Sequence, residues 1–99
     1  MNFQRIKTLQ KEYGYSEVQE LINSGMAWKL EGSVGRNAMQ MLEYGYCMLP
    51  KIDRFDTYGN TVPSRDKLKA GTKGTYKNCK QLWERVENGE IDLNLEIDI

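Results

Sequence analysis

The residues best suited to chemistry lie between positions 62 and 80, in the stretch VPSRDKLKAGTKGTYKNCK. It contains one arginine and five lysines, together with two glycines and a single acid. Gly74-Thr75 begins a predicted helix, whose free amide groups and dipole favour an anion. Lys73, Lys77 and Lys80 are spaced four and three residues apart, so they share one helical face. The stretch predicts either a phosphate-binding face or an ordinary solvated one.

The specific motif of nucleotide-binding loops is absent. A P-loop has the form G-x-x-x-x-G-K-[ST], whereas in Gly71-Thr72-Lys73-Gly74-Thr75 the lysine precedes the second glycine. Binding of phosphate or a nucleotide at Gly71–Thr75 is therefore a weaker alternative. The lysines would instead attract a nucleic-acid backbone irrespective of its sequence, with Tyr58 and Tyr76 as stacking or sugar contacts.

Catalysis is not expected from these residue types. The chain has no histidine, so the commonest general base near neutral pH is missing. Asp53, Asp56 and Asp66 lie among the basic residues, but their spacing does not fit a calcium-binding loop. Two cysteines without histidine do not complete a zinc site unless carboxylates join them. We predict no catalytic residue, no metal and no cofactor.

The ionic side chains are unevenly distributed, although the formal net charge is zero. Residues 51–80 hold eight basic against three acidic side chains, whereas residues 81–99 hold one basic against six acidic. The basic part predicts a surface that binds a partner or a phosphate. Its candidate residues are Arg54, Tyr58, Asn60, Arg65, Lys67, Lys69, Lys73, Lys77 and Lys80.

The chain shows no sign of a membrane or secreted location. It has no apolar run of about 18 residues, and its first residues, MNFQRIKTLQKEYG, lack the apolar centre of a signal peptide. Cys47 and Cys79 stand in apolar surroundings that are typical of buried free thiols. We therefore predict a cytoplasmic protein without a membrane contact.

The pattern of apolar residues predicts one domain over residues 1–99, mainly α with a minor β element. Four to five short helices are expected, most of them in a helical part at 1–45, where Ser16 and Gln19 form a capping-box pattern and Ser33 could cap a helix after a break. A long, ordered basic loop follows at 46–75, and a helix capped by Thr75 at 76–88.

The last ten residues, EIDLNLEIDI, alternate strictly between apolar and polar side chains. Such a period of two predicts a strand at 90–99, with Ile91, Leu93, Leu95 and Ile97 on its pairing face. Its partner could be residues 46–52, a second copy of the chain, or the sheet edge of another protein.

Four methionines lie between positions 26 and 48. Met26, Met39, Met41 and Met48, with Trp28 and Leu42, predict one adaptable apolar cluster. The cluster is either core or a protein-binding groove.

Four stretches resemble small uncharacterised proteins of bacteriophages and related mobile elements: WKLEGSVGRNAM (28–39), CMLP (47–50), YGNTVPSR (58–65) and GTKG (71–74). The resemblance spans residues 24–83 and implies no activity. It implies an intracellular, phage-type context, in which short proteins often bind host or phage proteins. The positions it points to are Trp28, Glu31, Gly32, Arg36, Asn60, Arg65 and Lys73.

Together these features predict a non-enzymatic interaction or regulatory protein. It would be phage-encoded and would bind a host protein in the manner of an inhibitor, through the basic loop at 54–80 and the terminal strand. A homodimer is the other form of protein partner. The alternative is a nucleic-acid-binding module that uses the lysine-rich loop and helix face.

Overall fold

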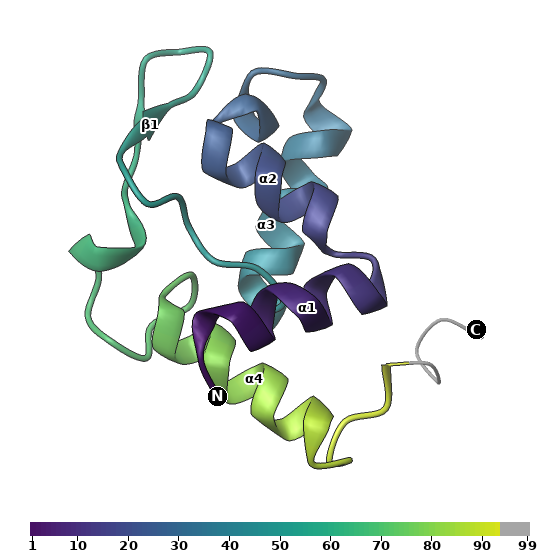
Figure 1. Ribbon diagram of the computed structural model, residues 1–99. Coiled ribbons are helices and arrows are strands. Elements are labelled where there is room, and N and C mark those ends of the chain that lie inside the picture. The colour runs from purple at the N-terminus through teal and green to yellow at the C-terminus, as the bar shows by residue number, and fades with distance from the viewer. Residues whose placement is uncertain (94–99) are drawn as a thin grey trace.

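A computed structural model describes residues 1–93 as four α-helices and a short β-hairpin, so the fold is mainly α with minor β, as predicted. The helices are α1 (Phe3–Tyr13), α2 (Ser16–Ser24), α3 (Gly32–Tyr44) and α4 (Tyr76–Glu87). Strands β1 (Arg54–Phe55) and β2 (Thr61–Val62) pair antiparallel, and two 3-10 helices are η1 (Met26–Trp28) and η2 (Arg65–Lys67). Figure 1 shows α1 and α4 side by side, with α2 and α3 above them and the hairpin beside α2.

Some helix ends follow the predicted capping residues and others do not. Thr75 caps α4, because its hydroxyl accepts a hydrogen bond from the backbone N–H of Asn78 at 3.3 Å. The predicted capping box of Ser16 and Gln19 is wrong: α2 begins after Tyr15 without a side-chain cap. Ser33 is likewise no cap, since it lies within the first turn of α3.

Two clusters of buried residues form the interior. The first lies mainly between α1 and α4 and contains Ile6, Leu9, Tyr46, Met48, Cys79, Trp83, Val86 and Leu93. The second lies between α2, η1 and α3 and contains Ile22, Ala27, Ala38, Leu42, Cys47 and Leu49. Residues 46–50, which we name the central segment, are all buried and contribute to both clusters.

The central segment belongs to no sheet, and side chains bind much of its backbone. Gln10 Nε2 and Trp83 Nε1 both donate to the Tyr46 carbonyl, at 2.8 and 3.1 Å. Gln19 binds Met48 twice: its Oε1 accepts from the Met48 N–H at 2.8 Å, and its Nε2 donates to the Met48 carbonyl at 2.9 Å. These bonds satisfy polar groups that would otherwise be buried without partners.

The predicted terminal strand is wrong for the residues that can be compared. Residues 90–93 form no strand; the chain bends after α4. Ile91 packs against the first cluster and Leu93 is buried within it. Their side chains are therefore used in the core of the same chain. Leu95 and Ile97 lie outside the described residues.

Cys47 and Cys79 are both free and buried, as predicted. Burial raises the pKa of each thiol to about 12, and in Cys47 the nearby Cys79 adds to the effect. Both are therefore protonated at neutral pH. None of the helices within residues 1–93 combines the length and the apolar character that a membrane-spanning segment needs.

Candidate functional site

Two of the predicted contact residues, Arg54 and Arg65, form hydrogen bonds within the fold. Arg54 Nε donates to the Asn23 carbonyl at 2.9 Å. Arg65 is only 5% exposed; its Nε donates to the Leu49 carbonyl at 2.7 Å and its Nη2 to Asn23 Oδ1 at 3.0 Å. Burial lowers the pKa of Arg65, while the nearby Asp66 acts in the opposite direction. The guanidinium groups of both residues are thus bound to the interior of the chain.

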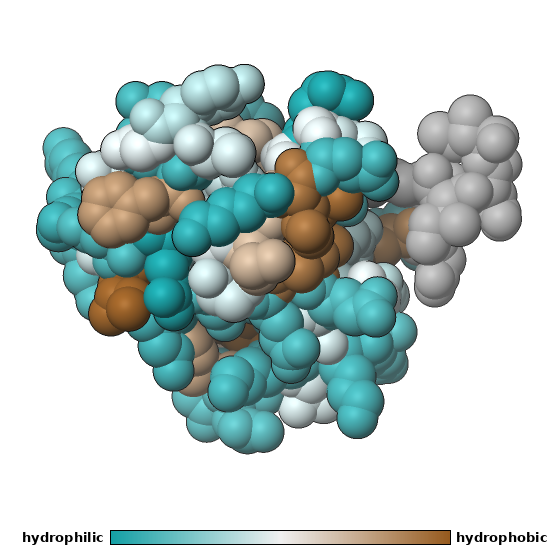
Figure 2. All heavy atoms as spheres, turned by 90° about the horizontal axis from the view of Figure 1, so that it is seen from above, coloured by the Kyte–Doolittle hydropathy of each residue, from teal (hydrophilic) through white to brown (hydrophobic). Residues whose placement is uncertain are grey.

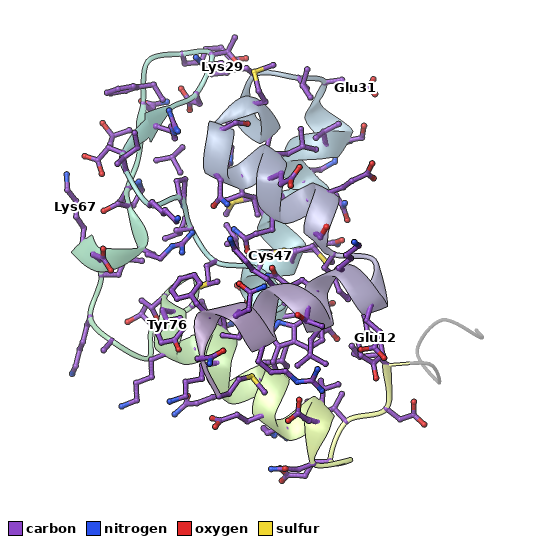
Figure 3. All side chains as sticks on the ribbon, viewed as in Figure 1. Glu12, Lys29, Glu31, Cys47, Lys67 and Tyr76 are labelled. Carbon is purple, nitrogen blue, oxygen red and sulfur yellow. The ribbon has the colours of Figure 1, made fainter. Side chains whose placement is uncertain are left out.

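Two of the predicted lysines have acidic partners on the surface. Lys67 forms an ion pair with Asp53, and Lys73 forms one with Glu43. The hydrogen bond from Lys67, followed by that from the Ser64 N–H, lowers the pKa of Asp53. Figure 3 shows Lys67 pointing outward from η2. Because exposed pairs of this kind contribute little to stability, both lysines keep some freedom to bind elsewhere.

Lys69, Lys77 and Lys80 have no ion-pair partner among residues 1–93. Lys77 and Arg65 line a cavity of about 250 Å³ at the start of α4, next to Thr75. The Thr75 hydroxyl is already engaged, since it accepts from the Gly71 N–H at 3.2 Å and donates to the Thr72 carbonyl at 2.6 Å. The stretch Gly71–Thr75 is therefore a turn that caps α4. Of the predicted cations, Arg65 and Lys77 line this cavity.

Tyr58 and Asn60 lie at the tip of the hairpin, where Asp56 fixes the turn. The Asp56 carboxylate accepts from the Tyr58 N–H at 2.9 Å, from the Asn60 N–H at 2.8 Å and from Asn60 Nδ2 at 3.1 Å. Gly59 completes the turn with a φ of +82°, which favours glycine. The turn is thereby held in one conformation, and it leaves Tyr58 90% exposed.

A hydrogen bond joins the hairpin to η1, and large apolar side chains in and next to both elements are exposed. Thr57 Oγ1 donates to the Trp28 carbonyl at 3.0 Å, which joins the tip to η1. The exposed apolar side chains of this hairpin end, as we name it, are Met26, Leu30, Phe55 and Tyr58, at 42, 45, 53 and 90% exposure. Figure 2 looks onto this end and shows brown apolar areas separated by teal polar ones.

Of the residues at the hairpin end, the sequence indicates Tyr58 as a contact residue and Met26 as part of a possible protein-binding groove. No sequence signal indicates Leu30 or Phe55, since Phe55 is a single apolar residue between Arg54 and Asp56. The predicted methionine cluster is in fact divided: Met48 is buried and Met41 half-buried, whereas Met26 and Met39 are exposed. Trp28, Met39 and Leu42 line an apolar groove of about 290 Å³ between α3 and residues 61–63. The cluster is thus part core and part surface.

A family model matches part of the chain. Residues 16–52 match a domain of unknown function (DUF7417), which is less than half of the chain. This segment comprises α2, η1, α3 and the central segment, and it contains every residue of the second buried cluster. Searches of curated proteins and of solved structures gave no significant match. Within residues 1–93, no three His, Cys, Asp or Glu side chains form a group that could hold a metal ion.

Proposed function

We propose that the chain is a non-enzymatic interaction protein that binds a protein partner through the hairpin end. The observation that carries the proposal is Tyr58, an aromatic residue exposed at the tip of a turn that hydrogen bonds hold in place. Tyrosine is enriched among the residues that dominate binding energy at protein interfaces. A turn already fixed by Asp56 loses little conformational entropy on binding.

The neighbouring side chains support the same proposal. Met26, Leu30 and Phe55 would add apolar area around Tyr58, and large exposed apolar groups tend to mark contact surfaces. The proposal keeps the phage-type context implied by the sequence resemblance, with a host protein as the partner. It also keeps the cytoplasmic location, which the two free thiols support.

Site-specific photo-crosslinking tests the proposal. A photoreactive phenylalanine analogue at position 58 is expected to form a covalent adduct with one protein in a lysate of the cells that make the chain. The matched control carries the same analogue at position 44, because Tyr44 is also exposed, at 59%, but lies at the end of α3. Substitution of Phe55→Ser should reduce the adduct at position 58 several-fold, since an interface residue flanking a hot spot would be lost.

Two outcomes would contradict the proposal. If positions 58 and 44 give the same adducts, or if position 58 gives none, the hairpin end is not the contact surface. Circular dichroism of each variant verifies that the helices are intact.

A second candidate function is binding of a nucleic-acid backbone near the start of α4. The cavity lined by Arg65 and Lys77 favours it, as do Lys69 and Lys80, which have no ion-pair partner among residues 1–93. Retention on heparin or DNA that is lost between low and moderate salt would support it. Lys77→Glu should abolish such retention, whereas Lys11→Glu, which changes an exposed lysine of α1, should leave it largely unchanged.

A further inference from the structure

We propose that the outer face of α3 is a self-association surface whose partner is a second copy of this chain. Arg36, Met39, Gln40 and Glu43 occur at i, i+3, i+4 and i+7, so they form one stripe along the helix. All four side chains are exposed, and Met39 is 56% exposed. Ala38 and Leu42 are buried on the opposite side of the helix. The stripe therefore faces away from the core of its own chain.

The charges of this stripe are complementary to those of the same stripe on a second, antiparallel copy of the helix. Arg36 lies at one end, Glu43 at the other, and the uncharged Met39 and Gln40 lie between them. Two α3 helices related by a twofold axis beside Met39 and Gln40 would run antiparallel. Arg36 would then face Glu43 of the partner subunit, and the same pair would form a second time. Such self-complementarity is the property that a twofold interface requires.

Both charged groups are available for this contact. Arg36 has no ion-pair partner among the described residues, and its Nη1 lies beside Gly32, 3.1 Å from the position that a Cβ would occupy there. Glu43 pairs with Lys73, but both side chains are exposed, at 61 and 59%. A carboxylate has two oxygens, so Glu43 can keep Lys73 and also accept from Arg36 of the partner subunit.

Apolar contact would supply most of the binding energy. The twofold axis places the Met39 side chains of both copies on the same side of the helix pair. There each adjoins the apolar groove lined by Trp28 and Leu42. Methionine adapts its shape to such irregular surfaces. The formal net charge of zero means that two copies do not repel each other at long range.

The expected dimer is weak because one helix face is a small interface. About two turns of α3 are involved, so we expect dissociation constants in the micromolar range, typical of interfaces at the lower end of the size scale. The full chain should therefore change from monomer to dimer over a concentration series. Sedimentation velocity measures this change directly.

Charge substitutions test the antiparallel arrangement. Arg36→Glu and Glu43→Arg each create like-charge contacts across the twofold axis, and each should weaken the dimer by at least about tenfold. Neither substitution should unfold α3. The first adds an acid near the N-terminus of the helix and the second adds a base near its C-terminus, and both placements are favourable to the helix dipole. The double variant R36E/E43R restores opposite charges and should recover most of the affinity.

Mixing the two single variants gives a second, independent readout. Chains with R36E carry two acids on the stripe and chains with E43R carry two bases, so the mixture should form heterodimers more readily than either variant forms homodimers. Native mass spectrometry separates these species by mass. Parallel packing would instead place identical residues opposite each other, and the double variant would then gain nothing over the single variants.

Two controls isolate the contact. Lys73→Ala removes the internal partner of Glu43 but keeps the stripe, so it should leave the dimer unchanged within about threefold, because exposed pairs contribute little. Glu12→Lys changes an exposed acid at the end of α1, shown in Figure 3, and should also have little effect. The proposal is overturned if the wild-type chain stays monomeric at millimolar concentration, or if R36E and E43R dimerise like the wild type. Neither result would affect the cross-linking at Tyr58.

Discussion

At the scale of single residues, the most informative side chains are two buried glutamines. Gln10 and Gln19 are 1 and 6% exposed, although they lie on helices that face solvent on their other side. A primary amide carries a donor and an acceptor, like a peptide group, so Gln19 can bind the N–H and the carbonyl of Met48 as a neighbouring strand would. The central segment therefore needs no strand partner at that point.

Gln19→Met should destabilise the protein because it keeps the apolar volume but removes both bonds to Met48. Leaving a buried N–H and a buried carbonyl unpaired should lower the free energy of unfolding by about 2–4 kcal/mol. Urea denaturation followed by circular dichroism measures this change. Gln4→Met, at an exposed position of α1, is the control and should change it by less than about 0.5 kcal/mol. Equal stability of both variants would show that water replaces the amide of Gln19.

At the scale of elements, the sequence predicts the helices well where they depend only on residues close to each other in the chain. The helix predicted at 76–88 with Thr75 as its cap is α4 (Tyr76–Glu87), and the predicted helical part at 1–45 contains α1, α2 and α3, which end at Gly14, Gly25 and Gly45. The same local patterns misled where a side chain bonds to a distant part of the chain. Gln19 has the spacing of a capping residue, but its amide is used by Met48, 29 positions away.

The hairpin and residues 90–93 are two places where the pattern of apolar residues does not predict the structure. Strands of two residues are too short to produce an alternating pattern, so only the turn at Tyr58–Asn60 was predictable. Alternation at 90–99 predicts a strand, but Leu93 is buried although residues 90–93 form no strand. The break before α3 was predictable from glycine content. Glycines at 32 and 35 also allow another backbone to pack closely, and an added Cβ at Gly35 would indeed lie 3.3 Å from the Ala27 carbonyl oxygen.

The hairpin tip should respond to acid through Asp56. Burial acts to raise the pKa of this carboxyl, but hydrogen bonds from Asn60, Tyr58 and Gly59 together outweigh it, so the pKa is lowered. Because the folded-state pKa is below the unfolded value, ionised Asp56 stabilises the turn, fully above about pH 4, the ordinary value for aspartate. This contribution is lost as the pH falls through the lowered pKa.

NMR chemical shifts of the Tyr58 and Asn60 amide groups measure this transition. We expect both to titrate together below about pH 4, while amides of α2 stay unchanged. Asp56→Asn should remove the titration, since an amide oxygen does not ionise in this range. If the transition persists in D56N, another carboxyl, such as Asp53, controls the turn.

At the scale of the whole molecule, one polar network connects the helices to the loop around the central segment. Gln10 Nε2 donates to Gln19 Oε1, and Gln19 Nε2 donates to Asn23 Oδ1, both at 3.0 Å. Arg65 Nη2 donates to the same Asn23 oxygen, also at 3.0 Å. The network thus runs from α1 through α2 to η2, and most of its members also bind backbone of the central segment. A network with all members bonded favours one arrangement of the elements over others.

Arg65 is the point where the loop joins this network. Its guanidinium binds the Leu49 carbonyl and lies 5.4 Å from the centre of the Phe3 ring, which itself stacks on Tyr76 with ring centres 4.7 Å apart. Its backbone N–H also donates to the Pro50 carbonyl at 2.9 Å. One residue therefore contacts α1, α2 and the central segment, and the loop that contains η2 depends on it for its position.

Arg65→Met tests whether the loop is held mainly by this residue. The methionine keeps an apolar stem but leaves the Leu49 carbonyl without its donor, and we expect the free energy of unfolding to fall by about 1–3 kcal/mol. The local effect should be larger than the global one, because residues 51–75 otherwise contact the helices through few bonds. Limited proteolysis should therefore cleave this stretch in R65M well before it cleaves the helices. Arg5→Met, which removes an exposed ion pair with Glu87, should leave the cleavage pattern unchanged. Simultaneous loss of loop and helices in R65M would instead mean that the loop and the helical core unfold as one unit, with the polar network as part of a single cooperative structure.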